Sequence, residues 1–130
     1  MSIETRIDET TRRITQVLGA AESGATASRL IVDMVARRPE FSGWDWVHDV
    51  RKAEGRASLH DVEVAAAAFA NAPPGETFTV FVTTDRNLTL WCRVMDHQIP
   101  GRRHLTALTL EQAHADLDRR RGLSPAPGSG

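Results

Sequence analysis

The stretch ETFTVFVTTDRNLTLWCRVM, from Glu76 to Met95, decides the predicted fold. Its first half alternates between two faces, as a β-strand does. One face carries Phe78, Val80 and Val82, and the other carries Thr77, Thr79, Phe81 and Thr83. The residues Asp85, Arg86 and Asn87 are typical of a turn. Apolar residues then recur at every second position, at Leu88, Leu90, Cys92 and Val94. The pattern therefore predicts an antiparallel hairpin over about residues 76–95.

The second face of this hairpin needs a covering partner. It carries Phe81, Trp91, Met95 and Arg93 together with threonines. A two-stranded hairpin is marginal on its own, so helices, a third strand or a second chain must cover it. Large aromatic residues are also enriched at interaction hot spots. We therefore expect Phe81, Trp91 and Arg93 to bind a partner if the last helix leaves them open, and a homodimer is one such arrangement.

Two helical patterns lie near the N-terminus. Apolar residues recur at spacings of three or four over residues 3–18, with charged residues between them. This spacing predicts one amphipathic helix. A second pattern begins near Thr26 or Ser28 and stops at Pro39, which predicts a second helix.

The next segments also favour helices. Residues 41–52 predict a short helix, on which Trp44 and Trp46 would project roughly 200° apart. An exposed Trp44 would mark a partner site, whereas the favoured interpretation places both tryptophans in the core. Farther along, Ser58 and Asp61 have the spacing of a capping box. They predict an alanine-rich helix that ends before the prolines at positions 73 and 74.

The chain after the hairpin predicts one more strand and one more helix. Residues 104–108 have the composition of a third strand, and Thr109 with Gln112 predicts the start of a C-terminal helix. We predict an α+β fold in which N-terminal helices pack on a small antiparallel sheet that the C-terminal helix covers. Residues 1–122 form its single domain, and residues 123–130 form a flexible tail.

Composition excludes several classes of protein. The 130 residues carry a formal net charge of −1, so they provide no overall positive field for nucleic acid. The longest apolar run, residues 64–70, is far too short for a membrane span. A single cysteine and the lack of a signal-peptide pattern predict a cytoplasmic protein. Abundant arginine and alanine, with Lys52 as the only lysine, favour a bacterial origin.

Three residues form the best candidate for a chemical site. Asp96, His97 and His104 lie in one region, where imidazole and carboxylate groups can converge. Their spacing matches no zinc motif, so we predict no metal and no cofactor. The adjacent pairs His48-Asp49 and His60-Asp61 carry less weight, because neighbouring side chains on a strand or helix point apart.

The remaining polar candidates have structural explanations. Cys92 lies among aliphatic residues, so we expect a buried thiol rather than a nucleophile. Arg102 and Arg103 form a basic pair that would contact a phosphate or an acidic partner if other arginines join them. Arginines 119–121 instead lie where a helix C-terminus favours cations.

Three functions are compatible with these patterns. The first is a non-catalytic protein-interaction or regulatory module, because hydrophobic surfaces are present without a convergent catalytic set. The second is a winged-helix DNA-binding regulator, which fits the order of elements. Against it, the would-be recognition helix from Ser58 to Asn71 contains no arginine or lysine. The third is a small enzyme or ligand-binding protein that uses the region of Asp96, His97 and His104.

Overall fold

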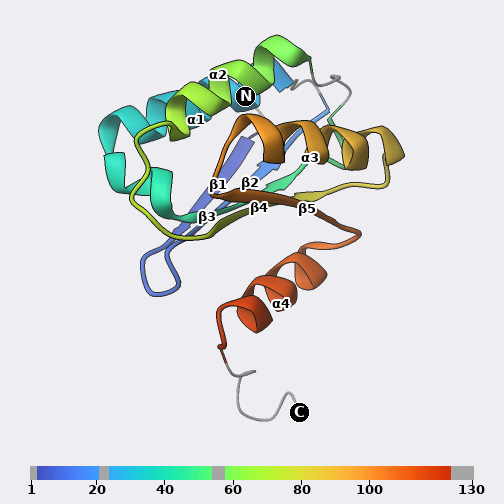
Figure 1. Cartoon of the computed structure of the whole chain (residues 1–130). Helices are drawn as coiled ribbons and strands as arrows, with labels where there is room; N and C mark the ends of the chain where they lie inside the picture. Colours follow the sequence, from blue (N-terminus) through green and yellow to red (C-terminus); the bar gives the residue numbers. More distant parts are fainter. Residues whose placement is uncertain (1–2, 21–23, 54–57, 124–130) are drawn as a thin grey trace.

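The computed structural model describes residues 3–20, 24–53 and 58–123, which form an α+β fold around one mixed sheet (Figure 1). The five described strands are β1 (Ile3–Asp8), β2 (Arg13–Leu18), β3 (Asp45–Asp49), β4 (Thr77–Val82) and β5 (Arg102–Ala107). The four described α-helices are α1 (Gly24–Arg37), α2 (Leu59–Phe69), α3 (Arg86–Gln98) and α4 (Leu110–Arg120), and a 3-10 helix, η1, spans Pro39–Gly43. None of these helices is long and apolar enough to span a bilayer.

The strands lie in sequence order across the sheet. β1 and β2 are antiparallel, whereas β2, β3, β4 and β5 run parallel to one another. Helices connect the parallel strands, as such crossovers require. The connecting helices α1, α2 and α3 cover one face of the sheet, and α4 lies on the other (Figure 1).

The predicted hairpin over residues 76–95 is wrong in its second half. The strand β4 is confirmed, but residues 86–98 form the helix α3. Asp85 starts this helix by accepting a hydrogen bond from the backbone N–H of Asn87 at 2.9 Å. Cys92 and Met95 then face the sheet, while Leu90 faces solvent. A spacing of four fits both an alternating strand and a helix, so the pattern did not distinguish them.

The predicted helix over residues 3–18 is also wrong, because this segment forms the antiparallel pair β1 and β2. Ile7 lies opposite Ile14. Asp8 closes the turn by accepting hydrogen bonds from the backbone N–H groups of Thr10 and Thr11. Ile, Val and Thr are abundant here, and β-branched residues favour strands.

The short helix predicted over residues 41–52 is wrong as well. Only η1 is helical, and the segment continues as β3, in which all five residues are buried. A central strand covered on both faces shows no alternation of polar and apolar residues, which hid it from periodicity. Trp44 and Trp46 are both buried, as the core interpretation predicted.

The other predicted elements are confirmed. α1 matches the second helical pattern, and Ser58 and Asp61 form a reciprocal capping box on α2. Thr109 caps α4. A strand is present as predicted around residues 104–108, but β5 spans 102–107 and pairs parallel to β4, so the sheet is mixed rather than antiparallel. Of the tail predicted over residues 123–130, residues 124–130 lie outside the described part.

Each face of the sheet has its own core. Against α4 lie aliphatic and aromatic side chains, namely Val47, Phe78, Val80 and Val82, together with Ala113 and Leu117 of the helix. The opposite core contains Ile14, Ile31, Phe41, Trp44, Trp46, Phe69 and Ile99. Among the described residues, the buried histidines His48 and His104 lie on this second face, and they form the candidate site.

Candidate functional site: a cavity with two buried histidines

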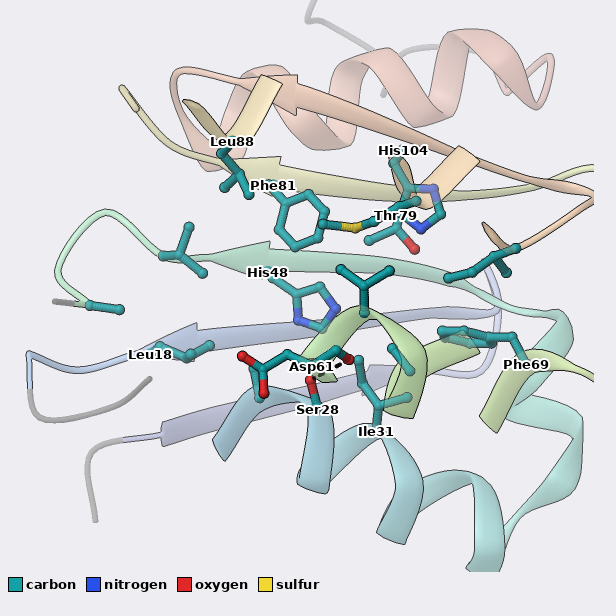
Figure 2. A pocket seen from close by; sticks show the side chains of 17 residues that line it. Leu18, Ser28, Ile31, His48, Asp61, Phe69, Thr79, Phe81, Leu88 and His104 are labelled. Atoms are coloured by element: carbon teal, nitrogen blue, oxygen red, sulfur yellow. Dashed lines mark hydrogen bonds between the residues drawn. The ribbon is translucent and has the colours of Figure 1, made fainter. Parts of the chain in front are cut away.

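A cavity of about 120 Å³ lies between the sheet and helices α1, α2 and α3 (Figure 2). We call it the histidine cavity, because His48 of β3 and His104 of β5 line it. Its walls are mostly apolar and include Leu18, Ile31, Val62, Phe69, Leu88 and Met95. The polar side chains among its lining residues, besides the two histidines, are those of Ser28, Asp61 and Thr79. A few polar groups in an apolar cavity are typical of small-molecule sites.

His104 is held in place by Asp96 of α3. A carboxylate oxygen of Asp96 accepts a hydrogen bond from the backbone N–H of His104 at 2.6 Å and lies 3.0 Å from Nδ1 of its ring. Burial lowers the pKa of His104 to about 4, so the ring is neutral at pH 7. A carboxylate can only accept, so Nδ1 carries the proton and Nε2 keeps a free lone pair. No described residue donates a hydrogen bond to Nε2 of His104.

His48 has no hydrogen-bond partner within the described ranges. Its Nδ1 is fully buried and unpaired. Burial, and then the nearby charge of Arg102, lower the pKa of His48 to about 3, so this ring is also neutral at pH 7. A neutral imidazole offers one donor and one acceptor, and neither ring nitrogen of His48 has a hydrogen-bond partner among the described residues.

The rings on this face of the sheet form a fixed row. His48 pairs with Phe81 across β3 and β4, and their ring centroids lie 5.5 Å apart. Phe81 lies 6.4 Å from His104 on its other side, and Trp46 lies 5.8 Å from His48. The interplanar angles along the row are 19–27°. Side chains two residues apart on a strand share a face, which explains why Trp46 and His48 stand together.

Arg102 is a buried cation that anchors the backbone next to this row. Its guanidinium group is 3% exposed and donates hydrogen bonds to the carbonyl groups of Ser42, Trp44 and Phe78 and to the hydroxyl of Thr79. Burial lowers the pKa of Arg102 to about 9, so it remains charged at pH 7. These hydrogen bonds connect η1 and the residue that follows it to β4, and the charge of Arg102 disfavours protonation of both histidines.

The histidine cavity borders a wider groove at the carboxyl ends of β3 and β4. This outer groove has a volume of about 630 Å³. It shares Val50, Ala53 and Leu88 with the cavity, and Trp91 and Leu90 of α3 form part of its wall. Ligands of open α/β sheets bind at the carboxyl ends of the strands, which is where this outer groove lies and where the cavity borders it.

The structure joins some of the sequence-predicted residues and separates others. Asp96 and His104 meet, and Phe81 stands beside His104, but His97 is exposed on α3 and makes no described contact with the pair. Trp91 lines the outer groove. Trp44 is core, Arg102 is a buried support, and Arg93 and Arg103 are exposed without joining the cavity.

His48 was missed by reasoning from the sequence. It was considered only as a neighbour of Asp49, and the two side chains point apart, because Asp49 pairs with Arg51 at 2.7 Å on the other face. The useful signal was a histidine that shares one face of a short, fully buried strand with Trp46. A polar residue in a fully buried strand needs either a partner or a function.

Cys92 is not among the residues that line the cavity. Cys92 is buried, as predicted, although on a helix, and burial raises the pKa of its thiol to about 12. The thiol therefore stays protonated at pH 7. Within the described ranges, no group of three or more His, Cys, Asp or Glu residues has the arrangement of a metal site.

The sequence matches no protein-family model, and no curated protein is similar to it. What the chain does must therefore be inferred from its own residues. The histidine cavity is lined by two buried histidines, and Nδ1 of His48 is one of the buried polar atoms that lack a partner in the described part of the chain.

Proposed function

We propose that this chain is a ligand-binding protein that takes up a small molecule in the histidine cavity. The proposal depends on one observation: two buried, neutral imidazoles line an apolar cavity, and their ring nitrogens are not all partnered by described residues. An unpaired buried polar group costs about 1–3 kcal/mol. A ligand that bonds to a ring nitrogen facing the cavity satisfies that group, so its binding is favoured.

Binding is favoured over catalysis by what surrounds the Asp96 and His104 pair. A histidine oriented by a carboxylate has the arrangement of a general base. However, no described serine, threonine or cysteine hydroxyl or thiol is hydrogen-bonded to Nε2 of His104. The base therefore has no protein nucleophile to activate.

A fragment screen by two-dimensional NMR tests the proposal. Compounds of six to ten non-hydrogen atoms should shift the signals of His48, Phe81 and His104 in a saturable manner. A filled cavity provides the specificity check: Ala65→Leu adds a side chain to the cavity wall and should abolish these shifts. Ala67→Leu makes the same change on the exposed side of α2 and should leave them intact. If no fragment binds, or if Ala65→Leu binds as well as the unmodified chain, the proposal is wrong.

A protein-interaction role is the second candidate, and a different observation favours it. Leu90 is 60% exposed and Val94 is 37% exposed, one turn apart on α3 beside the half-buried Trp91. An apolar stripe of this kind on a helix fits a second copy of the chain. We propose a homodimer through this stripe. Light scattering at tens of micromolar should give twice the monomer mass, and Leu90→Glu should restore the monomer. A monomeric mass for the unmodified chain would contradict it.

The winged-helix hypothesis loses its supporting pattern. It depends on a hairpin that follows two helices, and α3 occupies the position of the second hairpin strand. The segment from Ser58 to Asn71 is α2 with its caps, and it packs beside α1 over the sheet.

A further inference from the structure

We propose that the ligand of the histidine cavity is an uncharged phenol-class molecule whose ring enters the cavity and whose hydroxyl donates a hydrogen bond to Nε2 of His104. This inference rests on the proposed function and specifies its ligand. Four properties of the cavity support it: its size, its walls, its charge and the roles of its hydrogen-bonding atoms.

The volume limits the buried part of the ligand to a single ring. The cavity measures about 120 Å³, and an apolar cavity of roughly 150 Å³ holds benzene. Flat surfaces also favour an aromatic ring over a branched chain. The row of Phe81 and His48 forms the floor, Phe69 forms part of the wall, and Met95 presents a thioether, which packs well against aromatic rings.

The charge of the cavity favours a neutral ligand. Its two histidines are neutral at pH 7, so they cannot compensate an anion. Arg102 is the positive charge that acts on both histidines, and its Nη atoms already donate to three carbonyl groups and one hydroxyl, so they do not bind an anion in the cavity. The negative charge of Asp96, which is bonded to His104, and of Asp61 in the lining further disfavours an anion. An unpaired ion buried among apolar side chains is expensive, so a carboxylate ligand is disfavoured.

The hydrogen-bonding atoms favour a hydroxyl group in particular. Asp96 fixes the proton of His104 on Nδ1, so Nε2 must receive a proton donor. Thr79 accepts a hydrogen bond from Arg102, which leaves its own hydroxyl proton available to donate. His48 also has one N–H to donate. A phenolic hydroxyl both donates and accepts, so it suits a lone pair and a donor in the same cavity.

A titration with phenol, benzene and benzoate, followed by NMR at pH 7, tests this inference. Phenol should bind about tenfold more tightly than benzene, which corresponds to one well-made hydrogen bond. Benzoate should not bind in the cavity. If benzene binds as tightly as phenol, or benzoate binds best, the phenol inference is wrong and the cavity is still a binding site. If none of these probes binds in the cavity but other fragments do, the phenol inference alone is wrong. If no fragment of any kind binds, both proposals are wrong.

Two histidine variants form a matched pair for this test. His104→Leu removes the acceptor and should reduce the preference for phenol over benzene to about one. His97→Leu changes an exposed histidine of α3 and should keep the tenfold preference.

A measurement on the unmodified chain covers the case in which His104→Leu does not fold. The 15N signal of Nε2 of His104 should move on addition of phenol, toward the value of a hydrogen-bonded acceptor. It should not move with benzene. An Nε2 signal that stays unchanged at saturating phenol contradicts the inference.

Discussion

Helices cover both faces of the sheet, but the side chains beneath them differ between the two faces. Under α4, aliphatic side chains meet Ala113 and Leu117, both of which are completely buried. Polar groups of that side form ion pairs: Arg121 binds the buried carboxylate of Asp45 at 2.6 Å, and the buried Arg13 binds Asp118 of α4 at 2.9 Å. Under α1, α2 and α3, the sheet instead presents histidines and aromatic rings to a cavity.

This difference indicates that the two faces of the sheet contribute differently to the stability of the fold and to binding. Close packing without polar groups supplies most of the free energy of folding, and it leaves no space for a ligand. Unpaired polar groups beside a cavity cost stability, so they persist where they serve another purpose. We therefore assign the α4 face to stability and the three-helix face to binding.

The largest expected effect is a loss of stability in acid, caused by the three-helix face. His48 and His104 have pKa values of about 3 and about 4 in the folded chain, against 6.5 in the unfolded chain. Unfolding therefore takes up protons below about pH 6.5, so the free energy of unfolding falls as the pH falls. The slope should approach roughly 1.4 kcal/mol per pH unit for each histidine. Urea unfolding measured from pH 7.5 to 4.5 checks this expectation.

One matched pair of variants tests whether the loss of stability in acid arises from the histidines of the cavity. His48→Phe replaces a buried imidazole by a ring that does not titrate, so the slope below pH 6.5 should fall by about half. His60→Phe changes an exposed histidine of α2 and should leave the slope unchanged. Equal slopes in both variants would show that the acid sensitivity arises elsewhere.

The next largest effect should come from the α4 face. Leu117→Ala removes a completely buried side chain from the core beneath α4. Substitutions of this kind cost about 2–5 kcal/mol, because they leave a void as well as removing apolar contact. We expect about 3 kcal/mol in urea unfolding, and unchanged binding to the histidine cavity in the fraction that remains folded. A cost below 1 kcal/mol would mean that α4 does not pack as closely as the comparison requires.

A smaller effect is expected from two substitutions that test how much space is available on each face of the sheet. Ala113→Leu adds the same atoms beneath α4 that Ala65→Leu adds beside the cavity. Overpacking a dense core costs about 1–3 kcal/mol, whereas filling an existing cavity costs little or adds stability. Ala113→Leu should therefore lower the midpoint of thermal unfolding, and Ala65→Leu should keep or raise it. The reverse order would contradict the assignment of the two faces.

The sequence predicted the elements that depend on local interactions and failed for several that do not. Local signals were read correctly: the capping box of Ser58, the cap at Thr109 and the strand β4 depend on neighbouring residues only. The segments over residues 3–18, 41–52 and 86–98 were misassigned, because their apolar spacing fits two periods or has none. β2 and β3 also depend on parallel pairing between segments far apart in the chain, which periodicity does not report.

The candidate site was partly visible in the sequence for a related reason. Asp96 and His104 were singled out by their proximity along the chain, and the turn after α3 brings them together. His48 lies 56 positions before His104 in the numbering and reaches it only through the parallel order of β3, β4 and β5. Without the strand order, no signal connects these two histidines.

The smallest effect is expected from removing the N-terminal cap of one helix on each face of the sheet. Ser58→Ala and Thr109→Ala each remove a side-chain acceptor from the first turn of a helix, at a cost of about 1 kcal/mol in urea unfolding. Their local consequences should differ. α2 packs beside α1 and α3, whereas α4 is the only described helix on its face. Hydrogen exchange in Thr109→Ala should therefore accelerate along α4 and in β4 beneath it. In Ser58→Ala, faster exchange should be confined to the first turn of α2. Equal spreading in both variants would mean that the two faces open as one unit.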